Sequence, residues 1–393
     1  MKKTKLVVAI MMLIGLAMGT SLMAAGTEPL GSPREVSTLD HLLWISTNSS
    51  SWGDDFIQTA NIDASATNTW NYNGLTYDGW SPIGNVTTRF EGNYDGNGFT
   101  IDGLFINRTT NYIGFFGYAS GATIQDIGVT NVNITGAEQV GGLLGRNYDS
   151  SIISNSYSTG SVSGSSFVGG LVGYTYNSTV SNNYSTGSVS GSNSVGGLVG
   201  HNYLSTVSNS YSTGSVSSFF SVGGLVGYNN SPVENSFYDS ETSGRSDNTG
   251  KGVPKTTLQM KTQSTFTDAG WDFTTIWNMD GITNDGYAFL RVFAPPTFTT
   301  WTGASSTSWC FAGNWVSGVV PDETMDAVID PVATQPVIDC VATCKDLTLH
   351  TGAVLSHTGG NAVTVHGDVY NSAGKRLIVG GSIILYSNIN IED

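Results

Sequence analysis

The chain has 393 residues, of which 39% are hydrophobic and 11% charged, and it contains 50 glycines. Its 15 basic and 30 acidic residues give a net charge of −15, which argues against the basic footprint that binding to nucleic acid or anionic membranes requires. A composition so rich in Gly, Ser and Asn can be disordered, but a strict internal repeat predicts that this chain folds.

Residues 1–25 have the pattern of a secretory signal peptide. Lysines at positions 2, 3 and 5 precede an apolar run over residues 6–18, and small residues end at Ala24 and Ala25, where cleavage is expected. An uncleaved anchor is the alternative, but the run is short for a span of about 20 residues. Removing the three lysines would leave 12 basic and 30 acidic residues, a net charge of −18. The mature chain has no second long apolar run, which predicts an extracellular or cell-surface protein without a transmembrane segment.

Residues 26–111 are expected to form an N-terminal cap and the opening coils. Within Glu35 to Asn48, Ser37 or Thr38 can cap a short helix. Its apolar stripe would be Leu39, Leu42, Leu43 and Trp44. A stacked-strand fold needs such a cap, because its open end would expose apolar core and unpaired strand edges. Irregular first strands are predicted at Phe56 to Asp63 and Trp80 to Val86.

The stretch around Asn93 resembles the start of a calcium loop. Asn93, Asp95 and Asn97 stand at loop positions 1, 3 and 5, with Gly98 at position 6. Position 12 is Leu104, where such a loop needs a bidentate Glu. A tight turn is therefore the preferred interpretation, and we predict no metal site.

Residues 112–244 contain a repeat that determines the fold. Four copies, each opening with Val-Gly-Gly-Leu, begin at Val140, Val168, Val195 and Val222, and residues 112–139 form a divergent fifth copy. The spacings of 28, 27 and 27 residues indicate stacked units, and no apolar stripe of helical length is present. Each copy has room for three short strands, predicted in the second copy at Gly170 to Tyr174, Thr179 to Tyr184 and Ser188 to Ser190. Coils stacked about 4.8 Å apart would pair each strand with its copy, which predicts an all-β parallel β-helix.

The aligned copies predict columns of equivalent side chains along the stack. One apolar column, two structural ladders and one exposed column follow from the alignment: Leu143, Leu171, Leu198 and Leu225; Asn155, Asn182, Asn209 and Asn235, with Asp126 in the divergent copy; Tyr157, Tyr184, Tyr211 and Phe237; and Thr159, Thr186 and Thr213. Stacked identical side chains allow amide hydrogen bonds and ring stacking along the axis. The Thr column is the predicted ligand-binding row. Glycine pairs such as Gly169 and Gly170 suit tight corners.

Residues 245–295 break the repeat and are expected to close the solenoid. Thr256 can cap one or two helical turns in KTTLQMK. A dense set of apolar side chains follows: Trp271, Phe273, Trp277, Tyr287, Phe289 and Leu290. These side chains would form a lid on the C-terminal end of the solenoid. An exposed aromatic platform for sugars is the alternative, and the exposure of the rings distinguishes the two.

Residues 296–393 are expected to form a second, small β-solenoid module. The segment opens after Pro295 and Pro296 and carries the pattern W-T-G, N-W, V-P and D-x-V-x-I, which is similar to the start of another class of secreted β-solenoid modules. Its last predicted coil, Ser382 to Ile391, has no cap. Either the native chain continues or this end packs on a partner.

All three cysteines lie in the second module. In an oxidising compartment one pair should close, with Cys310 joined to Cys340 or to Cys344, leaving one thiol. Zinc is a weaker alternative, because three ligands without a well-spaced fourth make a poor structural site.

The Gly-Gly-Leu-Val-Gly core followed by Ser-Asn-Ser-Tyr-Ser-Thr-Gly-Ser-Val-Ser-Gly resembles the GLUG-motif repeats of secreted and surface-attached microbial proteins. The resemblance extends over roughly Glu35 to Arg291, with an opening coil at Phe90 to Leu104 and a last coil at Asn235 to Gly244. It implies a β-solenoid of the kind found in adhesin-like proteins and as an accessory part of some proteases.

The sequence predicts a non-enzymatic role in adhesion or as a stiff interaction or spacer module, with no cofactor. Its partner would be a host-cell, matrix or envelope polysaccharide or protein. A carbohydrate-active β-helix enzyme, a polysaccharide lyase or hydrolase, is the first alternative. However, residues 150–233 hold no Asp, Glu, Lys or Arg, and no H-E-x-x-H pair occurs. A site could survive only near Asp95 and Asp102 or near Glu234, Asp239 and Glu241. Ice binding is the second alternative, weakened because only one Thr column is regular.

Overall fold

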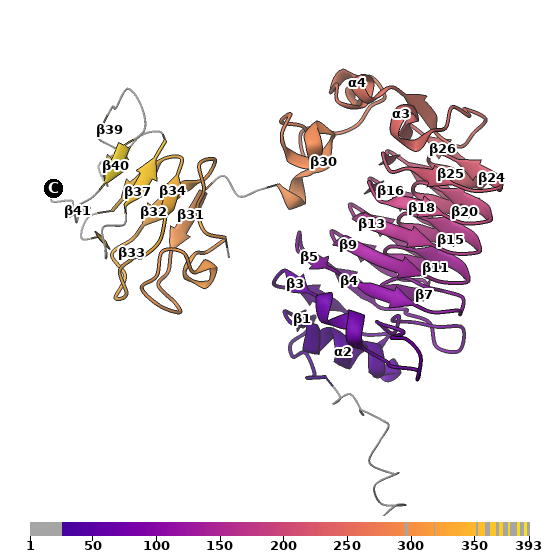
Figure 1. Cartoon of the computed structure of the whole chain (residues 1–393), viewed down its shortest axis with the longest axis horizontal. Helices are drawn as coiled ribbons and strands as arrows, with labels where there is room; N and C mark the ends of the chain where they lie inside the picture. The colour runs from indigo at the N-terminus through magenta and orange to yellow at the C-terminus, as the bar shows by residue number, and fades with distance from the viewer. Residues whose placement is uncertain are drawn as a thin grey trace, which may run out of the picture. The chain divides into compact units, whose positions relative to one another are not determined.

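A computed structural model describes residues 26–294, 298–317, 319–350, 353–357, 362–366, 369–371, 376–377, 383–385 and 389–390. The predicted signal peptide lies outside the described residues. The chain divides into two compact units, Met1–Phe293 and Ala294–Asp393. The first unit is a stack of parallel β-coils, in which strands that follow one another along a sheet come from successive coils (Figure 1). The predicted parallel β-solenoid is confirmed.

Four parallel sheets form the walls of the solenoid. The eight-stranded sheet consists of β1 (Arg34–Val36), β2 (Phe56–Gln58), β4 (Asn93–Asp95), β8 (Thr123–Gln125), β12 (Ile152–Ser154), β16 (Thr179–Ser181), β21 (Thr206–Ser208) and β26 (Val233–Glu234). The four-stranded sheet consists of β10 (Glu138–Gly141), β14 (Ser166–Gly169), β19 (Asn193–Gly196) and β24 (Phe220–Gly223). The five-stranded sheet consists of β7 (Phe116–Ser120), β11 (Leu144–Tyr148), β15 (Val172–Tyr176), β20 (Val199–Tyr203) and β25 (Val226–Asn229).

The eleven-stranded sheet joins the opening coils to the closing segment. Its main path consists of β3 (Ile62–Asp63), β5 (Thr100–Asp102), β9 (Gly128–Thr135), β13 (Tyr157–Ser163), β17 (Tyr184–Ser185), β22 (Tyr211–Ser212), β27 (Phe237–Asp239) and β28 (Val253–Lys255). Three shorter strands pair beside this path: β6 (Phe105–Asn107), β18 (Ser188–Ser190) and β23 (Val216–Ser217).

The register of the sheets follows the repeat. Val140 pairs with Val168, Val168 with Val195, and Val195 with Val222, so each coil of 27 or 28 residues adds one strand to each wall. Ile113 bridges to Val140, which confirms residues 112–139 as a fifth copy. The column Leu143, Leu171, Leu198 and Leu225 is fully buried inside the stack. The hydrophobic core is thus a continuous line of equivalent side chains.

The coils contain more strands than the sequence analysis predicts. The segment Thr179 to Tyr184 is split into β16 and β17, because Asn182 between them has φ 57° and turns the chain. The strand β19 was not predicted at all. Residues Trp80 to Val86 form only an isolated bridge from Ile83 to Phe116, so the second irregular strand is wrong.

The Asn column marks a corner of every coil. Asn155, Asn182, Asn209 and Asn235 have φ between 45° and 57°, and Asp126 in the divergent copy has φ 53°. Asn and Asp are the non-glycine residues that tolerate this left-handed region best. The predicted amide ladder is not the main reason for the column, since Oδ1 of Asn155 and of Asn209 accepts no hydrogen bond among the described residues.

The glycine pair at Gly169 and Gly170 meets its neighbours too closely for a side chain. A Cβ on Gly170 would clash with the carbonyl oxygen of Gly197 in the next coil and with the hydroxyl of Ser185 in the eleven-stranded sheet. The equivalent Gly197 is closed off in the same way by Gly224 and Ser212. Glycine is therefore required here by the approach of successive coils.

The N-terminal end of the solenoid is covered by α2 (Leu39–Thr47), as predicted. Thr38 is the N-cap, and its side chain accepts a hydrogen bond from the His41 amide. Leu42, Leu43 and Ile45 are buried, whereas Trp44 is only partly buried and stacks under Arg34. The apolar stripe therefore includes Ile45, which the prediction omitted. Two short 3₁₀ helices, η1 (Ser49–Ser51) and η2 (Ser65–Thr69), follow in the opening coils.

The closing segment packs on a side wall of the solenoid. It follows α3 (Ser240–Ser243) and contains α4 (Thr257–Met260), α5 (Ser264–Thr267), β29 (Trp277–Asn278), η3 (Thr283–Gly286), β30 (Phe289–Leu290) and η4 (Arg291–Phe293). Its side chains form one buried cluster with Tyr184, Tyr211 and Phe237. Trp271 donates to the Asn235 carbonyl at 2.7 Å, and Tyr211 donates to the Ala288 carbonyl at 2.5 Å. The predicted lid is thus lateral to the coils, and its buried rings cannot serve as a sugar platform.

Thr256 starts α4 with a full capping box, in which its side chain and that of Gln259 satisfy each other's backbone amides. This confirms the predicted cap of the KTTLQMK turn.

The second unit begins as a small parallel solenoid. Its parallel strands are β31 (Phe298–Trp301), β32 (Asp326–Ile329), β33 (Val337–Ile338), β34 (Ala342–Cys344), β35 (Leu347–Leu349), β36 (Val354–His357), β37 (Val363–Val365) and β38 (Val369–Asn371). The last three strands pair antiparallel with earlier ones: β39 (Arg376–Leu377), β40 (Ile383–Leu385) and β41 (Ile389–Asn390). The prediction that parallel coils continue to the end of the second module is therefore wrong.

The cysteines of the second unit form one disulfide, Cys310 to Cys340, and Cys344 is a buried thiol. The predicted pairing is confirmed for Cys340. Burial raises the pKa of Cys344 to about 12, so this thiol is unreactive at neutral pH.

The left-handed corner predicts how substitutions at Asn182 affect stability. Asn182→Ala should destabilise the first unit by about 1 kcal/mol, because an alanine disfavours φ above 0°. Asn182→Gly should leave stability within about 0.5 kcal/mol of the parent, since glycine adopts this conformation freely. Urea unfolding followed by circular dichroism measures both variants. Equal loss in the Ala and Gly variants would show that the amide, not the backbone, is what the corner needs.

Candidate functional site: the tyrosine face

The outward side of the five-stranded sheet carries two rows of aromatic and basic side chains, here called the tyrosine face. Backbone register places the first row as Tyr118, Arg146, Tyr174, His201 and Tyr228, one residue from each coil. The second row, two residues further along each strand, is Tyr148, Tyr176 and Tyr203. The strands β7, β11, β15, β20 and β25 lie one above the other along the stack (Figure 1).

The second row is a stack of parallel rings. The ring centroids of Tyr148 and Tyr176 are 4.9 Å apart, and those of Tyr176 and Tyr203 are 5.6 Å apart, with interplanar angles of 15° in both pairs. Tyr203 is 36% exposed, and Tyr228 of the first row is 44% exposed. The closing segment buries the Tyr184 ladder, whereas Tyr148, Tyr176 and Tyr203 lie outside the buried clusters of the described residues.

Buried residues between the two rows fix the strands from the inside. Asn147, Thr175 and Asn202 alternate with the outward side chains and are fully buried. Asn147 donates to the Thr175 hydroxyl at 3.1 Å, and Asn202 donates to Oδ1 of Asn229 at 2.8 Å. Coil-to-coil hydrogen bonds beneath the face therefore hold the outer rings in register.

Two arginines lie on the N-terminal end of the tyrosine face. The Arg146 guanidinium is 5.0 Å from the Tyr118 ring centroid and 4.8 Å from that of Tyr148. The Arg89 guanidinium is 5.1 Å and 5.6 Å from the same two rings. Burial raises the pKa of Tyr118, and the positive charges of Arg146 and Arg89 partly offset this rise. The rings thus hold two cations by cation–π attraction.

His201 is packed among aromatic rings in the middle of the first row. Its ring lies 4.9 Å from Tyr174, 4.7 Å from Tyr228 and 5.3 Å from Phe167. Burial lowers the pKa of His201 to about 4, and neither ring nitrogen has a hydrogen-bond partner among the described residues. The neutral imidazole therefore acts as another flat ring of the face at physiological pH.

Two hollows flank the exposed loop Asn85 to Thr88, beside the two arginines. One has a volume of about 270 Å³, and the other of about 550 Å³. The smaller is lined by Ser49, Trp52, Gly53, Val86, Thr87, Thr88, Arg89 and Glu91. The larger is lined by Pro82, Gly84, Asn85, Val86, Arg108, Thr110, Asn111, Tyr112 and Ile113. The Tyr112 ring contacts that of Tyr118 at 5.4 Å, which joins the larger hollow to the tyrosine face.

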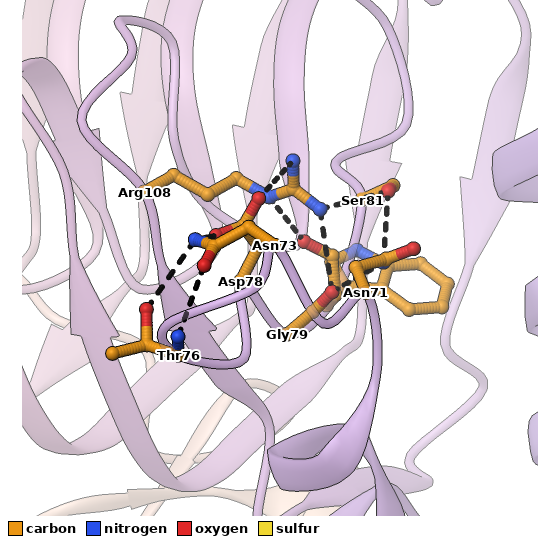
Figure 2. Close-up of polar contacts among 8 residues, drawn as sticks. Asn71, Asn73, Thr76, Asp78, Gly79, Ser81 and Arg108 are labelled. Atoms are coloured by element: carbon orange, nitrogen blue, oxygen red, sulfur yellow. Dashed lines mark hydrogen bonds and ion pairs between the residues drawn. The ribbon is translucent and has the colours of Figure 1, made fainter. Parts of the chain in front are cut away.

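Arg108 in the larger hollow has a structural role. Figure 2 shows its guanidinium among the polar groups of the loop that ends at Ser81. It donates to the carbonyl oxygens of Trp80 and Gly79 and to the Ser81 hydroxyl, and it lies 4.0 Å from an Asp78 carboxylate oxygen. This cation is already fully engaged, so it is unsuited to binding a ligand.

The predicted ligand row of Thr159, Thr186 and Thr213 is not a free flat surface. Thr159 accepts a hydrogen bond from the Asn131 amide at 2.9 Å. Thr213 is 8% exposed, and the Thr242 hydroxyl donates to its carbonyl at 2.5 Å. The column follows the covered Tyr184 ladder directly in sequence, which explains why its C-terminal end is buried. These contacts argue against this row as the binding site and against an ice-binding Thr array.

The other predicted ladders have structural positions. Tyr157, Tyr184 and Tyr211 stack at 4.7 and 5.2 Å with interplanar angles of 6°, and Phe237 pairs with Tyr211 in register. The closing segment buries the C-terminal part of this ladder. Burial raises the pKa of Tyr157 to about 12 and that of Tyr184 and Tyr211 well above 10. The ladder is thus a second core rather than a surface.

Three of the five acids considered for enzyme chemistry, Asp102, Asp239 and Glu241, are held by local hydrogen bonds. Asp102 accepts from Thr130 at 2.6 Å and from Asn131 at 2.7 Å. Asp239 is fully buried, where it caps α3 and accepts from Tyr287 at 2.8 Å. Glu241 accepts from the Thr257 amide at 2.9 Å. These contacts explain the acids as parts of turns and caps.

The sequence analysis predicts neither row of the tyrosine face: the first row is not a column of identical residues, and the second is one only in the first three copies. The four copies read Gly-Arg-Asn-Tyr, Gly-Tyr-Thr-Tyr, Gly-His-Asn-Tyr and Gly-Tyr-Asn-Asn after the shared Leu-Val or Leu-Leu pair. The signal was the alternation of a large ring or cation with a small polar residue, which is the pattern of a strand with one face outward.

Among the described residues, no group of three His, Cys, Asp or Glu side chains could hold a metal ion. No helix in that same part of the chain is both long and apolar enough to cross a membrane.

The position of His201 predicts a pH dependence of stability. The pKa of His201 is about 4 in the folded protein and 6.5 in the free side chain, so the unfolded chain binds more protons between these pH values. The contribution of the neutral His201 ring to folding stability is therefore complete above pH 6.5 and is lost as the pH falls to 4. His201→Tyr places the residue of the neighbouring coils, Tyr174 and Tyr228, at this position. The variant should lose about 1 kcal/mol less folding stability on acidification than the parent, a figure that is kept small because the ring is partly exposed. Unfolding midpoints of the parent and the variant, measured at pH 7 and pH 4.5, test this prediction. An unchanged difference between the two midpoints would contradict the assignment.

Three comparisons with known proteins bear on this architecture. Residues 136–163 and 191–217 match the family model of the GLUG motif, and residues 300–390 match a model described as a domain of unknown function, DUF8693. The chain is 38% identical over 160 residues to Halomucin of Haloquadratum walsbyi, covering 39% of this chain and 2% of that protein. It is 34% identical over 174 residues to a "Putative Gly-rich membrane protein" of Evansella cellulosilytica, covering 44% of this chain and 14% of that protein.

The chain thus spans a small part of the length of both relatives. A crystal structure from Bacteroides ovatus, described as "a putative immunoglobulin A1 protease", aligns with a TM-score of 0.49 at 19% identity, over 66% of this chain and 92% of that one. The two motif matches indicate a repeat protein. The chain is a β-solenoid built on GLUG-motif repeats.

Proposed function

We propose that this surface repeat protein is a non-enzymatic adhesion module that binds an extracellular polysaccharide along its tyrosine face. The observation that carries the proposal is the row of Tyr148, Tyr176 and Tyr203, whose rings stack at 4.9 and 5.6 Å on an uncovered wall. The C–H faces of sugar rings pack on flat aromatic rings, while their hydroxyls stay hydrated. Because the row places one ring on each successive coil, it offers a line of contacts that suits a polymer better than a single small molecule.

The rigidity of the face supports a binding role. The rings sit on strands whose buried Asn147, Thr175 and Asn202 are hydrogen-bonded from coil to coil. Little side-chain freedom is then lost when a ligand is bound, and preorganisation of this kind increases affinity. A pure spacer would need the stacked coils but would have no need for exposed rings, so exposure favours binding over a spacer function alone.

A polysaccharide lyase or hydrolase is the rival proposal. Such an enzyme needs an acid and a base beside the bound sugar. The two rows of the tyrosine face, with Arg89 beside them, contain tyrosines, two arginines and His201 but no carboxylate, and the acids Asp102 and Asp239 are held in turns and caps elsewhere. Product release in the binding assay would favour the rival.

The proposal predicts that truncating two rings of the second row weakens polysaccharide binding. The double substitution Tyr148→Ala and Tyr176→Ala should reduce affinity about tenfold or more, because each lost aromatic contact is worth roughly 0.5 to 1.5 kcal/mol. Binding is measured by affinity electrophoresis and calorimetry on a panel of neutral and acidic polysaccharides, with reducing ends assayed in parallel.

The matched control is the double substitution Tyr72→Ala and Tyr77→Ala. These rings form a pair at 5.2 Å and are 62% and 41% exposed, and they belong to neither row of the tyrosine face. The control should bind like the parent. Equal loss in both double variants, or release of sugar by the parent, would overturn the proposal.

A further inference from the structure

We propose that Arg89 and Arg146 form an anion site at the N-terminal end of the tyrosine face, which selects polysaccharides that carry carboxylate or sulfate groups. The inference rests on the proposed function and names the class of polymer that the face prefers. It depends on the position and the unpaired state of these two cations.

The two guanidinium groups lie over the same pair of rings. Both are within 5.6 Å of the Tyr118 and Tyr148 ring centroids, and Arg146 is also 5.2 Å from that of Tyr174. A guanidinium over an aromatic ring is held through its flat face, which leaves N–H groups at its edge for an acceptor. Such an edge matches a carboxylate or a sulfate, which accepts two parallel hydrogen bonds.

Neither arginine has a carboxylate partner in the described part of the chain, where Arg34 and Arg108 both have one. Arg245 and Arg291 also lack a carboxylate partner among the described residues, but their guanidinium groups donate to backbone carbonyls. Moreover, the buried Nε of Arg146 donates to no acceptor among the described residues. Two like charges that share the same rings without a counterion are most stable when an external anion lies between them.

The surroundings leave room for such a ligand. Arg89 is exposed and lines the hollow of about 270 Å³ beside the loop Asn85 to Thr88. The second row begins next to it at Tyr148 and continues to Tyr176. An acidic sugar at the arginines would therefore place the following sugars of the polymer on the stacked rings.

The test uses pairs of polymers that differ only in charge: polygalacturonate against its methyl ester, and dextran sulfate against dextran. The parent protein should bind at least one charged polymer tenfold or more tightly than its neutral counterpart, with affinity that falls as salt rises. The two pairs distinguish carboxylate from sulfate. Arg89→Gln with Arg146→Gln should abolish the preference for the charged polymer and the salt dependence of its binding.

Two further double variants separate this role from general charge and from folding. Lys261→Gln with Lys345→Gln removes the same charge from exposed ion pairs elsewhere and should keep the preference. Arg89→Lys with Arg146→Lys keeps the charge but loses the planar edge, and should retain only part of the preference. Thermal unfolding confirms that each variant is folded.

Equal binding of charged and neutral polymers by the parent would overturn the anion site and leave the proposed function standing. A preference that survives in the Gln variant, or disappears equally in the Lys261 and Lys345 variant, would also overturn it. If Tyr148→Ala with Tyr176→Ala has no effect on any polymer while the Gln variant loses binding, the tyrosine face fails and the anion site stands.

Discussion

The pairing of each coil with an equivalent copy of itself is the constraint on which the first unit depends. Every wall is parallel, and residues one repeat apart are hydrogen-bonded neighbours. A residue chosen at one position must therefore tolerate itself, or a close substitute, directly above and below. Asparagine recurs at Asn182 because the corner needs a left-handed residue, and Gly170 has a glycine partner because the coils approach too closely for a Cβ.

The same constraint produces two ladders of tyrosine rings, one buried and one on an uncovered wall. The ladder through Tyr184 and Tyr211 is covered by the closing segment and becomes a second hydrophobic core. The ladder through Tyr176 and Tyr203 stays on an uncovered wall. Stacking alone does not distinguish a structural ladder from a binding surface, and what covers the rings decides it. The closing segment thus divides the solenoid into a packed side and a side that it leaves uncovered.

The fold was largely predictable, whereas the candidate site was not. A period of 27 or 28 residues without a helical stripe leaves stacked β-coils as the consistent solution. Local sequence identified Thr256 as a cap and narrowed the first cap to Ser37 or Thr38. The candidate site could not be predicted from the sequence for two physical reasons. Alignment draws attention to identical columns, but the first row of the face varies, with Arg146 and His201 between tyrosines. The burial of Thr213 depends on a segment that follows the repeats, so no property of the repeat itself reveals it.

The most direct measurement of the central claim is hydroxyl-radical footprinting of the individual tyrosines, read by mass spectrometry with and without bound polysaccharide. The account predicts that Tyr176, Tyr203 and Tyr228 are labelled in the free protein and protected by ligand, while Tyr211 is protected throughout. Labelling of Tyr211 in the free protein, or ligand protection that leaves Tyr176 and Tyr203 unchanged, would contradict it.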